Sequence, residues 1–261
     1  MKTKSKALLL ALCAVLLVVA SVLTTLAFLT ATDKVDNVFT VGSVTLGDNL
    51  QNGIDEAKVN ENGQPLKKDP QTSKDEVVAD KKDADRVQAN TYKLQPGKTY
   101  VKDPTIHVAS TSDPCFLFVK IENGLVQTIN GEPVDIEAAS AEGGYQTIKD
   151  QMSALGWKQV TDATIVDGIY AYVGTAAGAT LPLQVAGGED KTVFNEFKVD
   201  GDVDGAILDQ FKDKKITVTV YAVQASGFEG QTASQIITAA FPQLLVAEEP
   251  DETSPEVTIL S

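Results

Sequence analysis

The sequence is poor in the residues that most catalytic and metal sites use. It contains one histidine, His107, and two cysteines. A zinc hydrolase needs at least two imidazole or thiolate ligands in a frame such as H-E-x-x-H, and His107 has no such frame around it. A Ser-His-Asp site is not indicated either, because no G-x-S-x-G is present and His107 lies in an alternating, strand-like pattern. The sequence therefore predicts no catalytic residue and a protein that is not an enzyme.

Cysteine offers little for covalent stabilisation. Cys13 lies in the hydrophobic N-terminal segment, so Cys115 is alone in the rest of the chain. An intramolecular disulfide is therefore excluded after export. With Phe116 and Phe118 beside it, Cys115 is expected to be a small core residue. The alternative is an intermolecular disulfide or a reactive thiol.

Basic residues are outnumbered, with 22 Lys and Arg against 36 Asp and Glu and a formal net charge of −14. Residues 1–27 contribute three lysines and no acidic residue, so the remainder carries 19 basic against 36 acidic residues, a net charge of −17. Such a surface disfavours nucleic acid, which needs a basic footprint, and anionic lipid headgroups. Divalent cations and basic surfaces are the partners that it tolerates.

Residues 1–27 have the pattern of a signal peptide. Three lysines precede residues 7–26, which carry no charge. The pattern Thr25-Leu26-Ala27 suits a signal peptidase, so we expect cleavage after Ala27 and a mature chain that begins at Phe28. The alternative is an uncleaved N-terminal anchor, since 20 apolar residues can span a bilayer. Both place the remaining chain outside the cytoplasm, with membrane contact only through this segment.

The remaining sequence divides into four parts by composition. Residues 28–46 include an alternating stretch, 37–46, that predicts a strand with apolar side chains on both faces. Residues 47–90 are polar with almost no aromatic residue, which predicts a disordered insertion. Residues 91–245 are expected to form the folded domain, and residues 246–261 an acidic, flexible tail.

Short strands dominate the predicted domain, which indicates a mainly β, antiparallel β-sandwich with a few short helices. The densest apolar run, residues 115–123, is expected to be a central strand, and residues 216–226 show the clearest alternation. Helical spacing predicts short helices over 145–155 and 232–241. Asp-Gly between two β-rich arms predicts a hairpin over residues 164–174.

The junction between leader and mature chain resembles a known family. It reads Ala27-Phe28, then Thr32-Asp33, then N-V-F-T-V-G over residues 37–42. This order is similar to that of the TasA and camelysin family of Gram-positive bacteria, whose leaders are cut by the signal peptidase SipW. The resemblance implies a secreted, jelly-roll-like β-sandwich at the cell surface that polymerises into biofilm-matrix fibres by donor-strand exchange.

The apolar strand at residues 37–46 fits that expectation physically, because a strand with two apolar faces can complete a neighbour's sheet and produce a head-to-tail homopolymer. The side chains expected to fill an acceptor groove are Val38, Phe39, Val41, Val44 and Leu46. The alternative is that this strand folds into its own sheet. The expected partners are further copies of this chain and other matrix or surface proteins. Competing functions are a monomeric, adhesin-like surface module and a camelysin-like metallo-endopeptidase.

One acidic motif remains. Asp200, Asp202 and Asp204 alternate as in the opening of a calcium loop, and a weak calcium site is the one cofactor that the sequence suggests. Phe211 stands where a bidentate glutamate would close such a loop. The alternative is a polar turn in which Asp204 caps a helix over residues 205–212.

Overall fold

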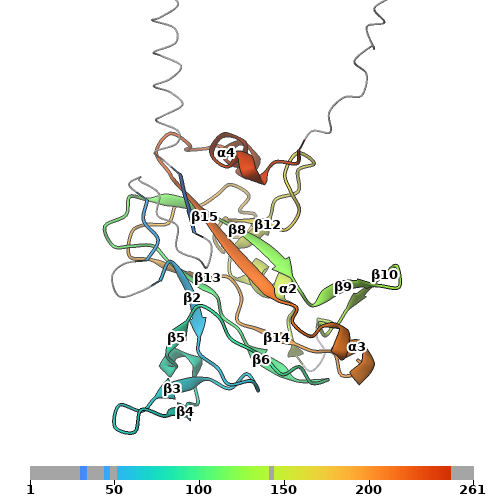
Figure 1. Cartoon of the computed structure of the whole chain (residues 1–261). Helices are drawn as coiled ribbons and strands as arrows, with labels where there is room; N and C mark the ends of the chain where they lie inside the picture. The colour runs from blue at the N-terminus through green and yellow to red at the C-terminus, as the bar shows by residue number, and fades with distance from the viewer. Residues whose placement is uncertain (1–29, 34–43, 48–51, 141–143, 248–261) are drawn as a thin grey trace, which may run out of the picture.

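The computed structural model describes residues 30–33, 44–47, 52–140 and 144–247. Two antiparallel sheets, three small strand pairs and a few short helices make up the described chain, which confirms the predicted mainly β sandwich (Figure 1). Within these residues, no helix is long and apolar enough to cross a bilayer.

The first sheet has five strands and carries the most apolar segments. Its order is β1 (Thr30–Asp33), β15 (Ile216–Gln224), β8 (Cys115–Asn123), β12 (Ile169–Tyr172) and β11 (Trp157–Gln159). β8 lies in the middle, as its apolar sequence predicts, and pairs with β15 along its whole length. The predicted strand over residues 216–226 is confirmed as β15.

The second sheet has four short strands: β13 (Asp190–Thr192), β7 (Thr105–His107), β2 (Ile54–Ala57) and β5 (Arg86–Val87). Residues 44–47 extend it. Leu46 pairs with Val108, the Gly47 amide donates to the His107 carbonyl at 2.7 Å, and the Ala109 amide donates to the Thr45 carbonyl at 2.9 Å.

Three strand pairs lie beside the two sheets. They are β6 (Thr99–Val101) with β14 (Glu196–Lys198), β9 (Val126–Ile129) with β10 (Glu132–Asp135), and β3 (Leu66–Lys68) with β4 (Asp75–Val77). Asn130 and Gly131 connect β9 to β10 with φ values of 53° and 88°. Positive φ at both positions is the geometry of a tight hairpin turn, which asparagine and glycine tolerate best.

The helices are α2 (Ile148–Ala154), α3 (Gly205–Gln210) and α4 (Ala233–Ala240), with 3-10 turns η1 (Lys81–Asp83) and η3 (Pro242–Leu244). Both helices predicted from apolar spacing are confirmed, as α2 and α4. Thr232 begins α4 through a capping box with Gln235, and Pro242 follows its end. These are the start and stop signals that the sequence carries.

The first sheet has an apolar core on each face. One core lies towards the second sheet and includes Val119 and Val220. The other lies under α4, where Phe241 packs edge-on against Phe118 and Tyr221. This arrangement explains why β8 and β15 are apolar at both odd and even positions.

The prediction of a disordered insertion over residues 47–90 is wrong for the described residues from 52 onward. They form β2 to β5, and all four residues of β2 are buried. Composition misled the prediction because the charged side chains here pair with one another and with distant residues. Two buried carboxylates, Asp55 and Glu56, thereby become part of the second sheet.

The predicted hairpin over residues 164–174 is also wrong. Ile165 pairs with Leu245, and β12 pairs with β8 and β11 instead. Gly168 stands in the turn at a φ of +81°, where a Cβ would lie 2.6 Å from the Ile121 carbonyl oxygen. The Asp-Gly pair therefore turns the chain towards β8 rather than closing a hairpin.

Candidate functional site

Among the described residues, strand pairing covers only part of the edge of β15 that lies opposite β8. β1 pairs with Val220 to Val223, and within the described residues no strand pairs with residues 216–219 on the side opposite β8. Backbone groups on such an edge are available to an added strand. The sheet therefore offers a place where an extended segment could continue from β1.

A cleft of about 1080 Å³ runs along this edge. Successive strand residues point to opposite faces, yet Ile216, Thr217, Val218 and Thr219 all line the cleft. A cleft that meets side chains of both faces follows the edge of a strand. Its other walls come from residues 88–94, β2, and the segment that joins α3 to β15.

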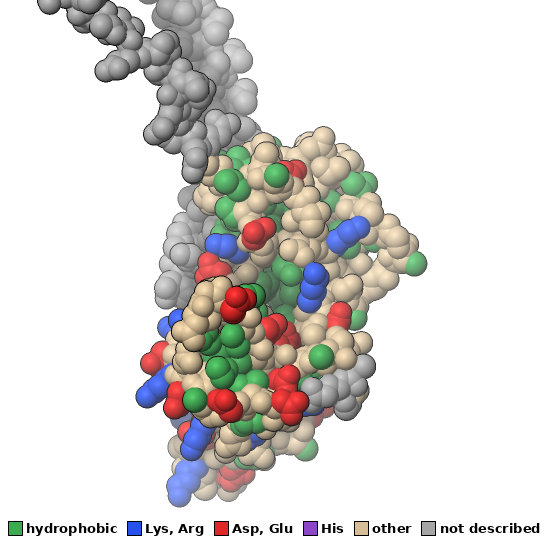
Figure 2. All heavy atoms as spheres, turned by 90° about the vertical axis from the view of Figure 1, so that its right-hand side faces the viewer, with side chains coloured by type: hydrophobic (Ala, Val, Ile, Leu, Met, Phe, Trp, Pro, Cys, Tyr) green, Lys and Arg blue, Asp and Glu red, His purple; other side chains and the backbone are tan. Residues whose placement is uncertain are grey.

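The floor of the cleft is apolar and aromatic. Tyr92 packs edge-on against Phe197, with ring centroids 5.3 Å apart, and donates its hydroxyl to the Val101 carbonyl at 3.0 Å. Burial, together with the nearby charge of Glu56, raises the pKa of Tyr92. Phe211 is buried beside the segment that leads into β15. Figure 2 shows a face of the molecule where apolar side chains are visible in a hollow between basic and acidic ones.

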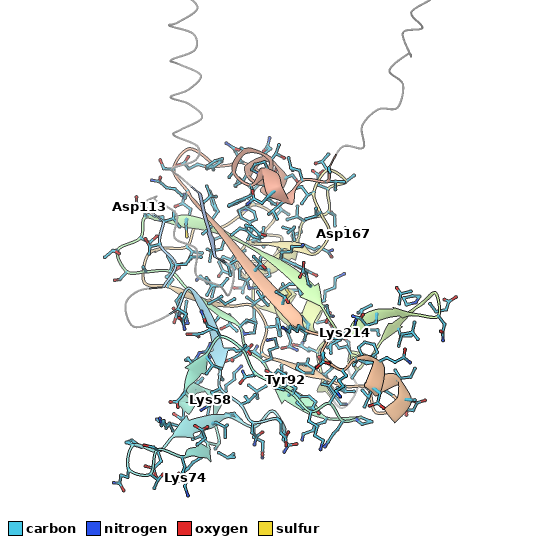
Figure 3. All side chains as sticks on the ribbon, viewed as in Figure 1. Lys58, Lys74, Tyr92, Asp113, Asp167 and Lys214 are labelled. Atoms are coloured by element: carbon cyan, nitrogen blue, oxygen red, sulfur yellow. The ribbon has the colours of Figure 1, made fainter. Side chains whose placement is uncertain are left out.

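The rim of the cleft is rich in lysine. Lys102 pairs with Glu56 at 2.6 Å, and Lys120 pairs with Glu122 at 2.9 Å. Four further lysines line the cleft, are exposed, and have no ion pair within the described residues: Lys93, Lys212, Lys214 and Lys215. Figure 3 places Tyr92 and Lys214 in the lower half of the molecule, away from Asp113.

Next to the cleft lies a charge network in which the partly exposed Arg86 pairs with buried carboxylates. Arg86 donates to Asp55 at 2.7 Å and to Asp103 at 3.0 Å, and so connects β5, β2 and the segment before β7. Asn90 donates to Glu56 at 2.8 Å. Unpaired carboxylates could not be buried at this depth without a large desolvation cost. These contacts therefore fix the wall of the cleft that residues 88–94 form.

His107 lies at the centre of the second sheet. Its Nε2 is 3.0 Å from Asp55 and its Nδ1 is 2.8 Å from Asp190, and only 8 % of its side chain is exposed. Burial alone would lower the pKa of His107, but the hydrogen bonds to Asp55 and Asp190 outweigh burial and raise it. Burial alone would raise the pKa of Asp55, but its hydrogen bonds to His107 and Arg86 outweigh burial and lower it. Because each ring nitrogen of His107 is hydrogen-bonded to a carboxylate, neither nitrogen is positioned to act as a base on a substrate.

The predicted calcium residues serve a turn and a helix. Asp200 accepts from the Asp202 amide at 2.8 Å, and Asp204 caps α3 by accepting from the Ile207 amide at 2.9 Å. The helix-capping alternative is thus confirmed, although α3 ends at Gln210 rather than 212. Within the described residues, no group of three or more His, Cys, Asp or Glu is arranged to hold a metal ion.

Two of the predicted assembly residues are described. Val44 is buried in the core between the sheets, and Leu46 pairs with Val108 of the same chain. Val38, Phe39 and Val41 lie outside the described residues, as do the cleavage-site residues Ala27 and Phe28.

Cys115 is fully buried, as the core interpretation predicts. Burial, and then the charge of Glu189, raises the pKa of its thiol to about 12. A thiol that stays protonated and inaccessible is a poor nucleophile, which argues against the reactive-thiol alternative.

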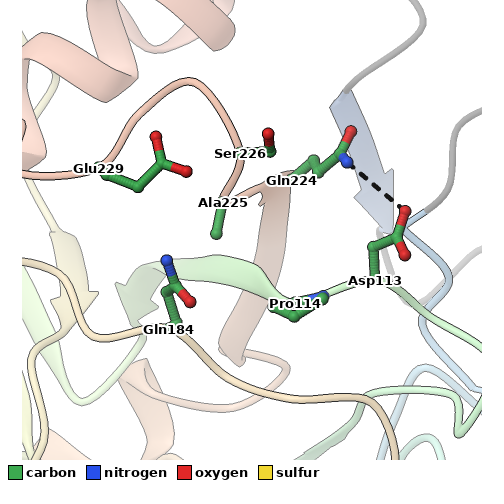
Figure 4. A pocket seen from close by; sticks show the side chains of 7 residues that line it. All are labelled: Asp113, Pro114, Gln184, Gln224, Ala225, Ser226 and Glu229. Carbon is green, nitrogen blue, oxygen red and sulfur yellow. Dashed lines mark hydrogen bonds between the residues drawn. The ribbon is translucent and has the colours of Figure 1, made fainter.

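A second cavity, of about 260 Å³, lies where β8 begins and β15 ends (Figure 4). It is lined by Asp113, Pro114, Gln184, Gln224, Ala225, Ser226 and Glu229. Gln224 donates to Asp113 at 3.5 Å, a long and weak bond, and Glu229 accepts from the Gly227 amide at 2.8 Å. This small polar pocket lacks the apolar floor of the cleft.

No family model matches the chain, and neither a curated protein nor a solved structure matches it. A function can therefore be inferred only from the sequence and structure of this protein. Sequence reasoning missed the cleft and the charge network because both use residues from the segment predicted to be disordered. The apolar residues Ile54, Ala57 and Val59 among the charges of that segment were the available signal.

Proposed function

We propose that this protein is secreted and acts as a structural component of the cell surface or extracellular matrix, and that its subunits assemble head to tail by exchanging their N-terminal segments. The observation that carries the proposal is the edge of β15: β1 covers four of its residues, and the edge then continues into a cleft with an apolar floor and a charged rim. A segment that begins as β1 has room there to extend along the same edge.

Exchange of β1 between subunits is energetically accessible. Four paired residues contribute a few backbone hydrogen bonds, each worth about 1 kcal/mol net. The same bonds form whether β1 belongs to the subunit or to its neighbour, so protein concentration decides between the two states. A head-to-tail contact that does not close produces a filament.

The contacts of residues 44–47 define where the exchanged segment would end. Buried Val44 and the hydrogen bonds of Thr45 and Gly47 hold this short stretch on the second sheet of its own subunit. The proposed exchange therefore involves residues 28–43, with Val38, Phe39 and Val41 as side chains for the acceptor cleft. Val44 and Leu46 remain with their own subunit.

A pair of cysteines at positions 31 and 222 tests this proposal, because Ala31 and Ala222 are paired across β1 and β15. We expect A31C/A222C protein that is oxidised after assembly to give a ladder of linked subunits on a non-reducing gel, and electron microscopy to show fibres. Protein oxidised as a dilute monomer should be locked and should not assemble until it is reduced. The single variant A31C is the matched control, since Cys115 is buried.

The competing function is a monomeric surface-binding module, which the pairing of Leu46 with its own chain favours. In that case the double cysteine variant would give only internally linked monomers at every concentration, and sedimentation would detect one species. A chain lacking residues 28–43 would then remain monomeric as before, whereas the exchange proposal expects fibres from the intact chain and none from the truncated one.

A further inference from the structure

The lysine rim of the cleft is positively charged, whereas the chain as a whole is negatively charged. The whole chain carries a formal charge of −14, yet Lys93, Lys212, Lys214 and Lys215 are exposed along one opening. The acidic residues that share this lining and have no ion pair within the described part of the chain are Asp209 and Asp213. Lysines therefore outnumber carboxylates two to one in this part of the rim.

The sequence contains one segment of matching charge. Residues 248–261 hold five acidic residues and no basic one: Glu248, Glu249, Asp251, Glu252 and Glu256. Over most of the surface, negative charge would repel such a segment. The lysine rim is a place where the local sign favours it, at separations within the Debye length of about 8 Å.

The described residues that precede this segment are held by the chain that leads into β12. The Val246 amide donates to the Thr164 carbonyl at 2.9 Å, and Leu245 pairs with Ile165. A few residues further on, the Gly168 carbonyl accepts from the Ile121 amide at 2.9 Å. Lys120 and Glu122, on either side of Ile121, line the cleft.

The length of the segment is sufficient. Fourteen residues from 248 to 261 can span roughly 46 Å when extended. Because Leu245 packs against the apolar core under α4, the preceding residues lie on the first sheet, and an extended segment of this length can run along that sheet towards the lysines that follow α3.

We propose that the lysine rim of the cleft is the docking site of the acidic segment 248–261 of this chain. Its carboxylates pair with Lys93, Lys212, Lys214 and Lys215, and the apolar residues Val257, Ile259 and Leu260 contact the floor. This docking needs no filament and is tested on monomers, but residues 248–261 would compete with the exchanged segment 28–43 for the floor of the cleft.

Zero-length carbodiimide cross-linking of the chain from residue 28 onward, kept dilute and monomeric, tests the proposal. The reagent joins a lysine to a carboxylate that touches it, and mass spectrometry identifies the pair. We expect links from residues 248–261 to concentrate on the four rim lysines and to be lost in high salt. Lys67, Lys68 and Lys74 on the exposed β3–β4 hairpin are the matched controls.

Mixing isotopically light and heavy protein distinguishes the source of the docked segment. Links that join two light or two heavy peptides only show that a subunit binds its own residues 248–261. Links between a light and a heavy peptide show that it binds those of a second copy. Either result supports the rim lysines as the docking site. Links spread equally over the control lysines, or absent from the rim, would overturn it.

A binding measurement gives a second, independent readout. A labelled synthetic peptide of residues 248–261 should bind a full-length variant whose own five tail carboxylates are changed to amides. Because each exposed ion pair contributes little by itself, K212Q/K214Q/K215Q together should weaken binding about tenfold. K67Q/K68Q/K74Q should leave it unchanged, and equal weakening by both triple variants would contradict a specific rim site.

Discussion

The two sheets of this sandwich are stabilised in different ways. The first sheet buries apolar side chains on both faces, and its strands β8 and β15 pair over nine residues. The second sheet has strands of two to four residues and is joined by buried charges around Asp55, Arg86 and His107. Hydrophobic burial depends little on pH, whereas charge pairing depends on it strongly. The two halves of one domain should therefore respond differently to mutation and to solvent.

The largest effect is expected in the first sheet. Phe118 is fully buried and packs edge-on against Phe241, so Phe118→Ala leaves a cavity under α4. We expect a loss of about 3–5 kcal/mol in the free energy of unfolding, with little dependence on pH. Urea denaturation at pH 6 and pH 8 measures both. A loss that differs strongly between the two pH values would contradict the conclusion that apolar burial stabilises the first sheet.

A smaller effect is expected when the charge network is broken. Arg86→Met removes the partner of two buried carboxylates, Asp55 and Asp103. Breaking a buried pair typically costs 3–5 kcal/mol, but 32 % of the Arg86 side chain is exposed, so we expect about 2 kcal/mol. Lys67→Met on an exposed strand is the control and should change stability by less than about 0.5 kcal/mol.

The direction of the pH dependence distinguishes the sheets further. The pKa of His107 is raised above its ordinary value of 6.5, so protonated His107 is favoured in the folded state. The stability that His107 contributes to the fold is fully present below pH 6.5. It is lost as the pH rises through the raised pKa that His107 has in the folded protein.

We therefore expect the stability of the native chain to fall as the pH rises above 6.5, and His107→Gln to be less stable but to show no such fall. Urea midpoints at half-unit pH steps measure this. An equal slope in both proteins would show that His107 does not carry the dependence. Asp55 acts in the opposite sense: because its pKa is lowered, its contribution is present at neutral pH and is lost in acid.

The smallest effect is expected at a helix end. Thr232→Ala removes the side-chain cap of α4, which covers the first sheet. We expect a loss of about 1 kcal/mol that does not change with pH. Thr232→Ser keeps the hydroxyl and is the matched control. Thermal unfolding measures both variants, and similar losses in the two would mean that the cap bonds are not responsible.

Much of the first sheet could be predicted from the sequence. Residues 115–123 and 216–224 carry dense or alternating apolar patterns, and α4 carries its own capping signals. These are local properties, readable within about ten residues. The predicted hairpin over residues 164–174 failed because Ile165 pairs with Leu245, eighty positions away in the chain.

The candidate site could be predicted only in part. The predicted strand over residues 37–46 reaches the described residues only at its end, where Leu46 pairs with Val108. The cleft depends on β2 and on residues 88–90, which composition assigned to disorder. Hydrophilic composition and order coexist here because charges from separate segments neutralise one another. The sequence shows the charges but not which of them meet.

The sequence by itself determined the strongly acidic character, the central strands and the capped helices, because each follows from composition or from short-range periodicity. The tertiary structure decided that Asp55 meets Arg86 and His107, and that His107 meets Asp190, across separations of 31, 52 and 83 residues. It also decided that β1 leaves part of the β15 edge beside a cleft. Pairing energies of this kind depend on distance in space, which a linear pattern does not record.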